Sequence, residues 1–328
     1  MAGRAVSRGA GFLPEAYVGI GGRGPEDVVA DGRGRVLTGV EDGRVLRVDG
    51  LTEPGRARVE TLADTGGRPL GLELLPDGDL LVCDAERGLL RVTTGDGTVR
   101  LLADEVDGER LRFCSNAVAL SDGTVYFTVS SRRYPLHQWI GDIVEHTGTG
   151  RLLRLAPGKG APEVVLEGLQ FANGLVPSAD ESFLVVAETG PRRLTRVHLT
   201  GAGAGTSEPF VEDLPGTPDN MWRDPDSGLM WVALAGPRIG ALDRLHRAGP
   251  AVRSAASRVA VRAPFRPLGF AGVVAVDDQG HVVHTLVDRH SRYRMVTSAC
   301  VAEGRLILGS LWERGIAVCE LPGKGQSG

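Results

Sequence analysis

An internal repeat runs along most of this chain and limits the folds that it can adopt. Each copy contains a short apolar strand, a turn of the Pro-Asp-Gly type, a second apolar strand, a Gly-rich turn and a strand of the form Leu-x-Arg-Val. The copies begin at Pro25, Pro69, Ser115, Ala172, Pro218 and Thr297. About six units at a period of roughly 45 residues are typical of a β-propeller, in which each blade has four strands.

The repeat predicts an all-β fold, a six-bladed β-propeller with four-stranded blades that forms a single domain over residues 1–328. The last copy supplies only three strands. We expect the missing outer strand to come from the amino-terminal segment "EAYVGIG" (15–21), so that the N- and C-terminal strands close the ring in one blade and leave no open edge. A seven-bladed ring, in which the segment from Gly272 forms its own blade, is the alternative.

Two insertions interrupt the repeat, at about 131–150 and 237–266. The first contains Leu136, Trp139, Ile140 and Ile143 at helical spacing after Pro135, which predicts a short amphipathic helix. We expect that helix to cover the channel as a lid, with packing between blades as the alternative. The second is rich in Ala and Arg over 242–259 and is expected to be helical.

Charge and composition exclude several classes of partner. The net charge is −4, the isoelectric point is near 6.0, and Lys and Arg are scattered, so nucleic acid is not an expected partner. The chain has no secretory h-region and no apolar run near the roughly 18 residues that span a bilayer, so we expect a cytoplasmic protein without a membrane partner. A small-molecule substrate and a monomer or weak homo-oligomer are expected. The four cysteines lie in or beside apolar strands and are expected to be buried free thiols.

In a propeller, the first strand of each blade lines the central channel, so its leading residues meet at one mouth. Here the leading residues are Glu26, Leu70, Asn116, Asn173, Asp219 followed by Asn220, and Thr297. Two carboxylates and three amides suit Ca²⁺, which takes 6–8 oxygen ligands. Mg²⁺, Mn²⁺ or Zn²⁺ could substitute, although zinc usually selects His or Cys and no His leads a blade. Each Asn or Asp alone could equally cap a turn.

The motifs at these positions resemble those of a known family. "GPED", "GRPLGLEL", "NAVALSDGTVYFT", "FANGL", "GTPDNMWRD" and "VTSACVAEGRLILGSL" are similar to the strictosidine synthase-like branch of the gluconolactonase, senescence marker protein and paraoxonase superfamily. The resemblance covers residues 24–321. It implies a six-bladed propeller that hydrolyses lactones, aryl esters or organophosphates. The implied Ca²⁺ ligands are Glu26, Asn116, Asn173, Asp219 and Asn220.

Two departures from the superfamily pattern bear on mechanism. Paraoxonases have a His where this chain has Leu70, so a mechanism that uses that His is not available. The metal-free strictosidine synthases use a Glu on the last blade, and the matching position here is Thr297. The second difference weakens the expectation of a condensing enzyme, and the complete set of metal ligands weakens it further.

We therefore expect a Ca²⁺-dependent hydrolase of lactones or esters, in which the ion polarises the carbonyl and Asp219, with Asn116, is catalytic. Asp219 would act as base or nucleophile. A condensing or cyclising enzyme of specialised metabolism, with Glu188 as its free carboxylate, and a non-catalytic binding propeller with a structural calcium are the alternatives. The expected substrate-binding residues are Leu70, Tyr134, Trp139, Phe171, Glu188, Trp222 and Thr297.

Overall fold

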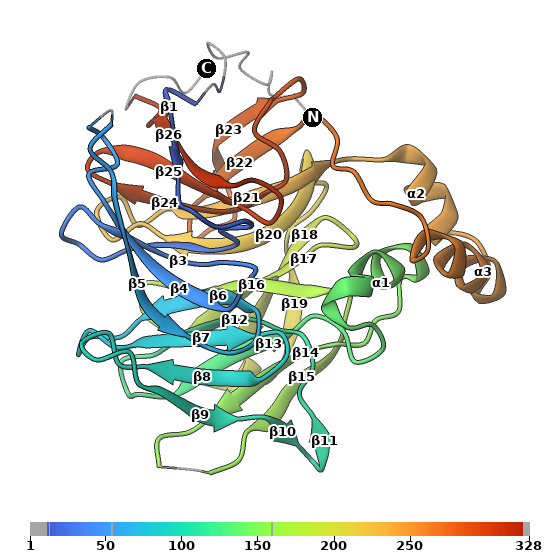
Figure 1. Ribbon diagram of the computed structural model, residues 1–328. Coiled ribbons are helices and arrows are strands. Elements are labelled where there is room, and N and C mark those ends of the chain that lie inside the picture. The colour runs from blue at the N-terminus through green and yellow to red at the C-terminus, as the bar shows by residue number, and fades with distance from the viewer. Residues whose placement is uncertain (1–11, 13, 54, 159, 324–328) are drawn as a thin grey trace.

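The protein is an all-β ring of six four-stranded antiparallel sheets, as the repeat predicts (Figure 1). The computed structural model describes residues 12, 14–53, 55–158 and 160–323. The segment from Gly272 provides the two outer strands of the fifth blade, so the seven-bladed alternative is wrong.

The strands follow one another outward from the channel in each blade. Blade 1 contains β2 (Val28–Ala30), β3 (Val36–Gly39), β4 (Arg44–Asp49) and β5 (Arg58–Asp64). Blade 2 contains β6 (Pro69–Leu74), β7 (Leu80–Asp84), β8 (Gly88–Val92) and β9 (Val99–Ala103). Blade 3 contains β12 (Cys114–Ala119), β13 (Val125–Val129), β14 (Gly150–Leu155) and β15 (Glu163–Leu169).

The second half of the ring repeats this order. Blade 4 contains β16 (Ala172–Pro177), β17 (Phe183–Glu188), β18 (Arg193–His198) and β19 (Ser207–Val211). Blade 5 contains β20 (Gly216–Arg223), β21 (Met230–Pro237), β22 (Ala271–Val276) and β23 (Val282–Asp288). Blade 6 contains β24 (Val296–Ala302), β25 (Arg305–Ser310), β26 (Gly315–Glu320) and, from the other end of the chain, β1 (Ala16–Gly19). A small hairpin of β10 (Glu105–Val106) and β11 (Glu109–Arg110) and the short helix η2 (Gly201–Gly203) lie in loops.

The ring closes between its two ends, as predicted. Strand β1 pairs antiparallel with β26, with Ala16 opposite Val318 and Gly19 opposite Gly315. This pairing removes an open edge from blade 6.

The core lies between blades. Six apolar clusters of the described residues each join one blade to the next, and the pair of Val28 and Ile307 between blades 1 and 6 is an example. The central strand β7 is buried along its whole length, because both faces of each sheet pack against a neighbouring blade. The four cysteines are buried and free, as expected.

Turn chemistry sets the ends of the strands. In the turn between β6 and β7, the Asp77 side chain accepts a hydrogen bond from the Asp79 amide at 3.1 Å. Gly78 has φ +88°, a conformation that favours glycine. The Asp-Gly pair therefore fits the backbone geometry of this reversal.

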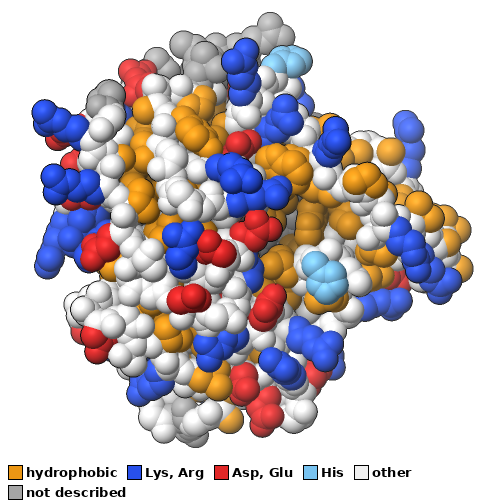
Figure 2. Space-filling model, in the orientation of Figure 1, with side chains coloured by type: hydrophobic (Ala, Val, Ile, Leu, Met, Phe, Trp, Pro, Cys, Tyr) orange, Lys and Arg blue, Asp and Glu red, His pale blue; other side chains and the backbone are white. Residues whose placement is uncertain are grey.

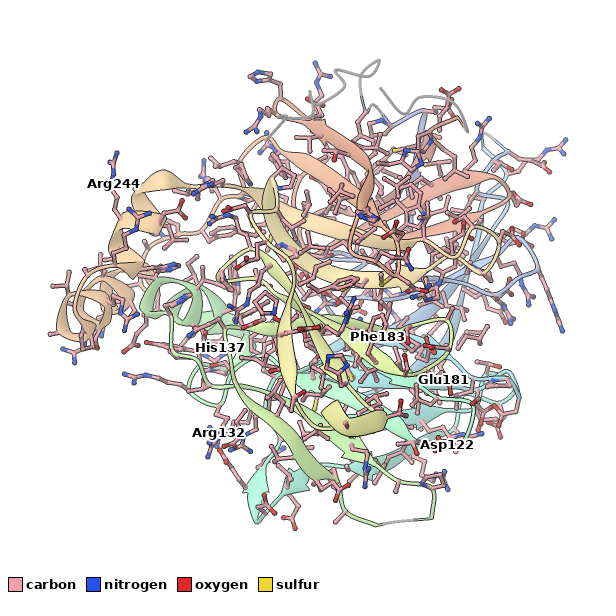
Figure 3. All side chains as sticks on the ribbon, turned by 180° about the vertical axis from the view of Figure 1, so that it is seen from behind. Asp122, Arg132, His137, Glu181, Phe183 and Arg244 are labelled. Carbon is pink, nitrogen blue, oxygen red and sulfur yellow. The ribbon has the colours of Figure 1, made fainter. Side chains whose placement is uncertain are left out.

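The two insertions form a helical layer on one side of the ring. Helices η1 (Leu136–Gln138) and α1 (Trp139–Glu145) lie between β13 and β14, and α2 (Gly240–His246) and α3 (Pro250–Ala260) lie between β21 and β22. Both views of the ribbon show α2 and α3 projecting from the ring, with α1 between them and the blades (Figures 1 and 3). Figure 2 shows apolar and basic side chains together on this projection. None of the helices in the described residues is long and apolar enough to cross a membrane.

Candidate functional site

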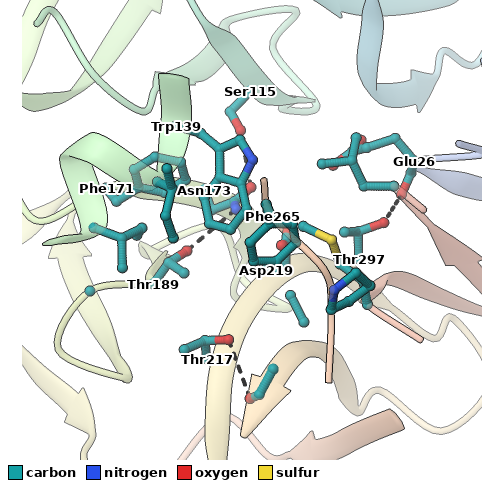
Figure 4. Close-up of a pocket in the computed structure, with 18 of the residues that line it drawn as sticks. Glu26, Ser115, Trp139, Phe171, Asn173, Thr189, Thr217, Asp219, Phe265 and Thr297 are labelled. Atoms are coloured by element: carbon teal, nitrogen blue, oxygen red, sulfur yellow. Dashed lines mark hydrogen bonds between the residues drawn. The ribbon is translucent and has the colours of Figure 1, made fainter. Parts of the chain in front are cut away.

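A cavity of about 320 Å³ opens at the mouth of the central channel, beneath the helical layer (Figure 4). Each blade contributes one residue of its first strand, or of the turn before it, to the floor. These six residues are Glu26, Leu70, Ser115, Asn173, Asp219 and Thr297. Residues far apart in the sequence therefore converge, because every blade presents the same position to the channel.

A second layer of side chains lies immediately below this floor. It consists of the next residue in four of the blades: Asp27, Asn116, Asn220 and Ser298. The remaining two blades have Gly71 and Gly174 at this level. A Cβ atom at Gly71 would lie 2.5 Å from the Asn116 Cα, and one at Gly174 would lie 2.6 Å from the Asn220 Cα. The glycines thus leave room for the two amides to fill the channel.

Glu26 is held from below and from the side. Its Oε1 accepts a hydrogen bond from Asn220 Nδ2 at 3.0 Å, and its backbone carbonyl accepts one from the Thr297 hydroxyl at 2.6 Å. Its Oε2 is buried and has no hydrogen-bond partner among the described residues. A buried oxygen without a partner costs on the order of 1–3 kcal/mol, more for a charged group, so this atom is poised for a ligand.

Asp27 ties the second layer together. It accepts hydrogen bonds from the Leu72 amide at 2.8 Å, the Ser298 hydroxyl at 2.5 Å and the Asn116 side chain at 3.4 Å. Asn116 also donates to Asn220 Oδ1 at 3.0 Å. The network links blades 1, 2, 3, 5 and 6 at the centre of the ring.

Asn173 is oriented from both sides in the floor. The Ser115 hydroxyl donates to its Oδ1 at 3.0 Å, and its Nδ2 donates to the Thr189 hydroxyl at 3.3 Å. Thr189 in turn donates to the Pro218 carbonyl at 2.7 Å, one residue before Asp219. Asn173 and Asp219 are therefore held at a fixed separation by neighbouring blades.

Burial perturbs the carboxylates of the site. Burial raises the pKa of Asp219 to about 8, against opposing hydrogen bonds from Asn173 and the Asn220 backbone. Burial and the charges of Asp219 and Asp27 hold the pKa of Glu26 well above its ordinary value, although Arg68 opposes this. Burial also raises the pKa of Asp27 to about 6. Two of these carboxyl groups face the cavity, and their charged forms lack a cationic partner in the floor.

The donor set fits a hard divalent cation. Within the described residues, no three His, Cys, Asp or Glu side chains gather as a metal cluster. Two carboxylates and neighbouring amides do gather, and the unpartnered Glu26 Oε2 lies among them. Oxygen donors of this kind suit Ca²⁺.

The walls of the cavity are apolar and come largely from the insertions. Trp139, Ile140 and Ile143 of α1 face it, with Phe265 and Leu268 from the segment after α3. The Trp139 and Phe265 rings meet edge to face with centroids 4.9 Å apart. The helix expected over the channel is therefore present, and it forms part of a roof over the floor of the site.

The roof is fastened to the blades and to itself. Arg192, which follows β17, pairs with Asp243 of α2 at 2.6 Å. The Tyr134 hydroxyl lies 3.1 Å from the Ser257 hydroxyl of α3 and donates to Glu145 of α1. The two insertions consequently behave as one packed layer.

Four of the seven expected substrate-binding residues line the cavity. They are Leu70, Trp139, Phe171 and Thr297. The other three lie elsewhere. Tyr134 braces α1 against α3, because its hydroxyl is used between the insertions.

Glu188 and Trp222 are also displaced from the cavity. Glu188 is fully buried at the end of β17 and is bound by Arg193 at 2.7 Å and the Thr195 hydroxyl at 2.6 Å, so it offers no free carboxylate. Trp222 lies further along β20, where it borders a separate hollow with Trp231 and Asp224. The residues that reach the mouth of the channel lie near the start of each inner strand or in the turn before it, and Trp222 lies beyond them.

Asn116 differs from its expected position by one layer. Ser115 takes the floor position in blade 3, and Asn116 corresponds to Asp27 and Asn220 in the layer below. Asn116 does not line the cavity, so direct catalytic contact with a substrate is not supported. In a strand, a shift of one residue changes the direction of a side chain, which is why the repeat alone did not separate the two layers.

The sequence also contains a signal for the second layer. Asp27 follows Glu26 as Asn220 follows Asp219, so the paired polar residues at the blade starts could have revealed the second layer. Thr189 and Met295 also line the cavity, but they belong to loops or strand ends outside the repeat, and no local pattern marks them.

The sequence matches two family profiles and is similar to several known proteins. A family profile described as strictosidine synthase matches residues 116–202, and one described as strictosidine synthase-like, N-terminal, matches residues 17–48. Protein STRICTOSIDINE SYNTHASE-LIKE 6 of Arabidopsis thaliana is 34% identical over 316 residues, which cover 94% of this chain and 83% of that protein. The adipocyte plasma membrane-associated protein of Rattus norvegicus is 36% identical over 223 residues, which cover 65% of this chain and 59% of that protein. The chain thus matches less than two thirds of that relative's length.

Solved structures show the same fold at lower identity. A Xanthomonas campestris protein described as a gluconolactonase superimposes with a TM-score of 0.66 at 17% identity and covers 97% of this chain, with 93% of its own chain matched. Agrobacterium tumefaciens regucalcin, described as a calcium-binding protein, has a TM-score of 0.59 at 17% identity, with 91% of this chain and 87% of its own covered. At these identities the likeness establishes the propeller fold.

Proposed function

We propose that this chain, which belongs to the strictosidine synthase-like family, is a Ca²⁺-dependent hydrolase of lactone or ester substrates. Its site is the cavity at the mouth of the central channel. The observation that carries the proposal is the floor of the cavity. Glu26 and Asp219 face an apolar space from two blades, and Glu26 Oε2 has no partner there among the described residues.

The residues that would hold the cation come from both layers. Glu26, Asn173 and Asp219 of the floor would contact the ion. In the layer below, Asn220 donates a hydrogen bond to Glu26 and Asn116 donates one to Asn220, which would hold Glu26 in place. When bound, the ion supplies Lewis acidity that polarises a carbonyl oxygen. The fold neighbours described as a gluconolactonase and as a calcium-binding protein are consistent with this chemistry in a similar propeller.

Asp219 is the residue of this chain that acts on the reacting atoms. It lines the cavity and is only 7% exposed. It either accepts the proton of the attacking water or attacks the carbonyl carbon itself. Asn173, held by Ser115 and Thr189, keeps its amide beside that carboxylate.

The roof supplies the setting for this reaction. Trp139, Ile143 and Phe265 present hydrocarbon to the acyl or alkoxy part of a substrate and keep bulk water from the floor. An apolar cavity with a few convergent polar groups is the usual form of a small-molecule site.

The geometry favours hydrolysis over the two alternatives. The condensing-enzyme alternative requires a free carboxylate at Glu188, but Arg193 and Thr195 bind this carboxylate. A purely structural ion would be enclosed by protein on all sides, whereas Asp219 faces an open cavity.

The test is hydrolysis of a panel of γ-lactones, δ-lactones and aryl acetates, before chelation, after chelation and after calcium is restored. We expect turnover that disappears with the chelator and returns with the ion. Asp219→Asn at saturating calcium should lose about 10²–10⁴-fold in kcat, the typical contribution of a general base. Asp226→Asn, at an exposed turn of the same blade, is the matched control. Turnover that is insensitive to both chelation and Asp219→Asn would remove the proposal.

A further inference from the structure

The segment 237–268, which contains α2 and α3, exposes an unusual amount of apolar surface. Of the ten large hydrophobic side chains that are exposed in the described part of the chain, five belong to this segment. These five are Ile239, Val252, Val259, Phe265 and Leu268, and their exposed fractions range from 38% to 70%. Val252 and Val259 are two turns apart on α3 and so lie on the same face of that helix.

The same segment is strongly basic. It contains seven arginines and one acidic residue, Asp243, in a chain whose overall net charge is −4. Arg238 pairs with Asp243 at 2.7 Å. The remaining arginines of the segment form no ion pair within the described residues, and five of them are exposed: Arg244, Arg247, Arg258, Arg262 and Arg266. Arg244 points away from the body of the protein (Figure 3).

The segment is held in a fixed orientation rather than free to refold onto the blades. Asp243 is anchored by Arg192, and the His246 ring lies 2.8 Å from the Ile143 carbonyl and stacks on His146 with centroids 4.1 Å apart. These contacts lie on the inner side of α2. The exposed apolar and basic residues are left on the outside, where Figure 2 shows them together on the projection.

The exposed residues continue to the entrance of the cavity. Ile239, Phe265, Arg266 and Leu268 belong both to this surface and to the lining of the cavity. A partner that covers the projection therefore meets the entrance as well.

We propose that segment 237–268 docks the protein on an anionic lipid surface. Arginines attract the headgroups, and Val252, Val259, Phe265 and Leu268 enter the boundary between headgroups and acyl chains, as in amphipathic helices that lie on membranes. Charge complementarity, together with the exposed apolar side chains, selects this occupant. Nucleic acid would satisfy the arginines, but it would leave the valines, Phe265 and Leu268 against water or phosphate.

This docking requires no spanning segment. The expectation of no membrane partner rests on the length of apolar runs in the sequence. That length determines whether a segment can span a bilayer, and it does not determine whether a surface can bind one. The proposal also does not depend on hydrolysis, so Asp219→Asn should bind lipid as the wild type does.

Co-sedimentation with large unilamellar vesicles tests the proposal. We expect the full chain to bind vesicles that contain phosphatidylglycerol in phosphatidylcholine, to bind pure phosphatidylcholine much more weakly, and to dissociate as salt is raised. Arg244→Gln with Arg258→Gln should weaken binding on the order of tenfold or more, because each arginine near an anionic surface contributes measurably. Val252→Ser with Val259→Ser should weaken it as well.

Matched variants elsewhere separate a specific surface from general charge. Arg58→Gln with Arg100→Gln removes the same charge from exposed outer strands, and Val59→Ser with Leu101→Ser removes exposed apolar side chains there. Both pairs should bind like the wild type, and thermal melts establish that every variant is folded. Equal binding to both lipid compositions, equal effects of test and control pairs, or binding to a labelled DNA duplex without binding to vesicles would overturn the proposal.

Discussion

Asn220 donates a hydrogen bond to Glu26 at 3.0 Å, which joins blade 5 to blade 1 in the centre of the ring. The bond uses Glu26 Oε1 and leaves the buried Oε2 without a partner among the described residues. It therefore fixes the direction of a carboxylate that lines the cavity. The proposed function depends on this arrangement.

Glu26→Gln should have opposite effects on stability with and without calcium. In the cation-free protein, burial and the neighbouring carboxylates raise the pKa of Glu26, which lowers the free energy of unfolding at neutral pH, so we expect the substitution to raise that free energy. Calcium should stabilise the wild type by about 2.7 kcal/mol at a free concentration about 100 times its dissociation constant, and the variant by much less. Chemical denaturation with chelator and with calcium measures both values.

The control for these opposite effects on stability is Glu86→Gln, at an exposed position. It should respond to calcium as the wild type does. Equal calcium stabilisation of Glu26→Gln and the wild type would show that Glu26 does not bind the ion.

Asp27→Ala should destabilise the ring itself. It removes the acceptor for the buried Leu72 amide and for Ser298. Leaving buried donors unpaired costs about 1–3 kcal/mol each, so we expect the free energy of unfolding to fall by about 2–4 kcal/mol. Urea denaturation compares it with Asp104→Ala, an exposed carboxylate that should change stability by less than about 0.5 kcal/mol. A similar small change for Asp27→Ala would mean that the second layer does not stabilise the fold.

Trp139→Ala should weaken substrate binding more than chemistry. The substitution opens the wall where Trp139 meets Phe265, and it leaves the floor untouched. For an apolar aryl ester we expect KM to rise about tenfold or more with little change in kcat, as for the loss of an apolar contact. Trp222→Ala, outside the cavity, should leave KM unchanged. A larger effect from Trp222→Ala would place the substrate elsewhere.

The roof should be sensitive to acid through His146 and His246. Burial, together with His246 and Arg253, lowers the pKa of His146 to about 4, and burial also lowers the pKa of His246. Arg193 also lowers the pKa of His146, and Arg192 lowers the pKa of His246. Glu188 and Asp243 act in the opposite direction and raise the pKa of His146 and His246, respectively. The contribution of His146 to stability is complete above its ordinary pKa of 6.5. It is lost as pH falls toward 4, because the unfolded chain takes up the proton first.

His146→Asn tests this contribution. His146 has φ +58°, and Asn tolerates that left-handed conformation. We expect the fall in Tm between pH 6.5 and 4 to be smaller in the variant than in the wild type. An identical fall, followed by circular dichroism, would assign the acid sensitivity to other groups.

The repeat contained nearly all the information that the fold required. The turn residues, the spacing of the strands and the incomplete last copy predicted six blades and the pairing of β1 with β26. Convergence of Glu26, Asn173 and Asp219 followed from their equivalent places in the repeat. These predictions succeeded because each depends on a position that recurs in every blade.

The errors concern side chains whose direction the repeat does not determine. Asn116 was displaced by one layer, because the strand register is irregular between Cys114 and Ala117. Tyr134 was expected in the cavity, but its position depends on packing between two insertions with no shared pattern. Glu188 was expected to be a free carboxylate, but it forms an ion pair with Arg193, which lies opposite it on the neighbouring strand β18.

Calorimetric titration of calcium into the chelator-treated protein tests the central claim most directly. The account predicts that one ion binds per chain and that Glu26→Gln and Asp219→Asn each weaken this binding severely, while Glu86→Gln does not. If no calcium binds the folded wild-type chain, or if both floor variants bind it unchanged, the carboxylates of the cavity are not a cation site and the proposed mechanism is contradicted.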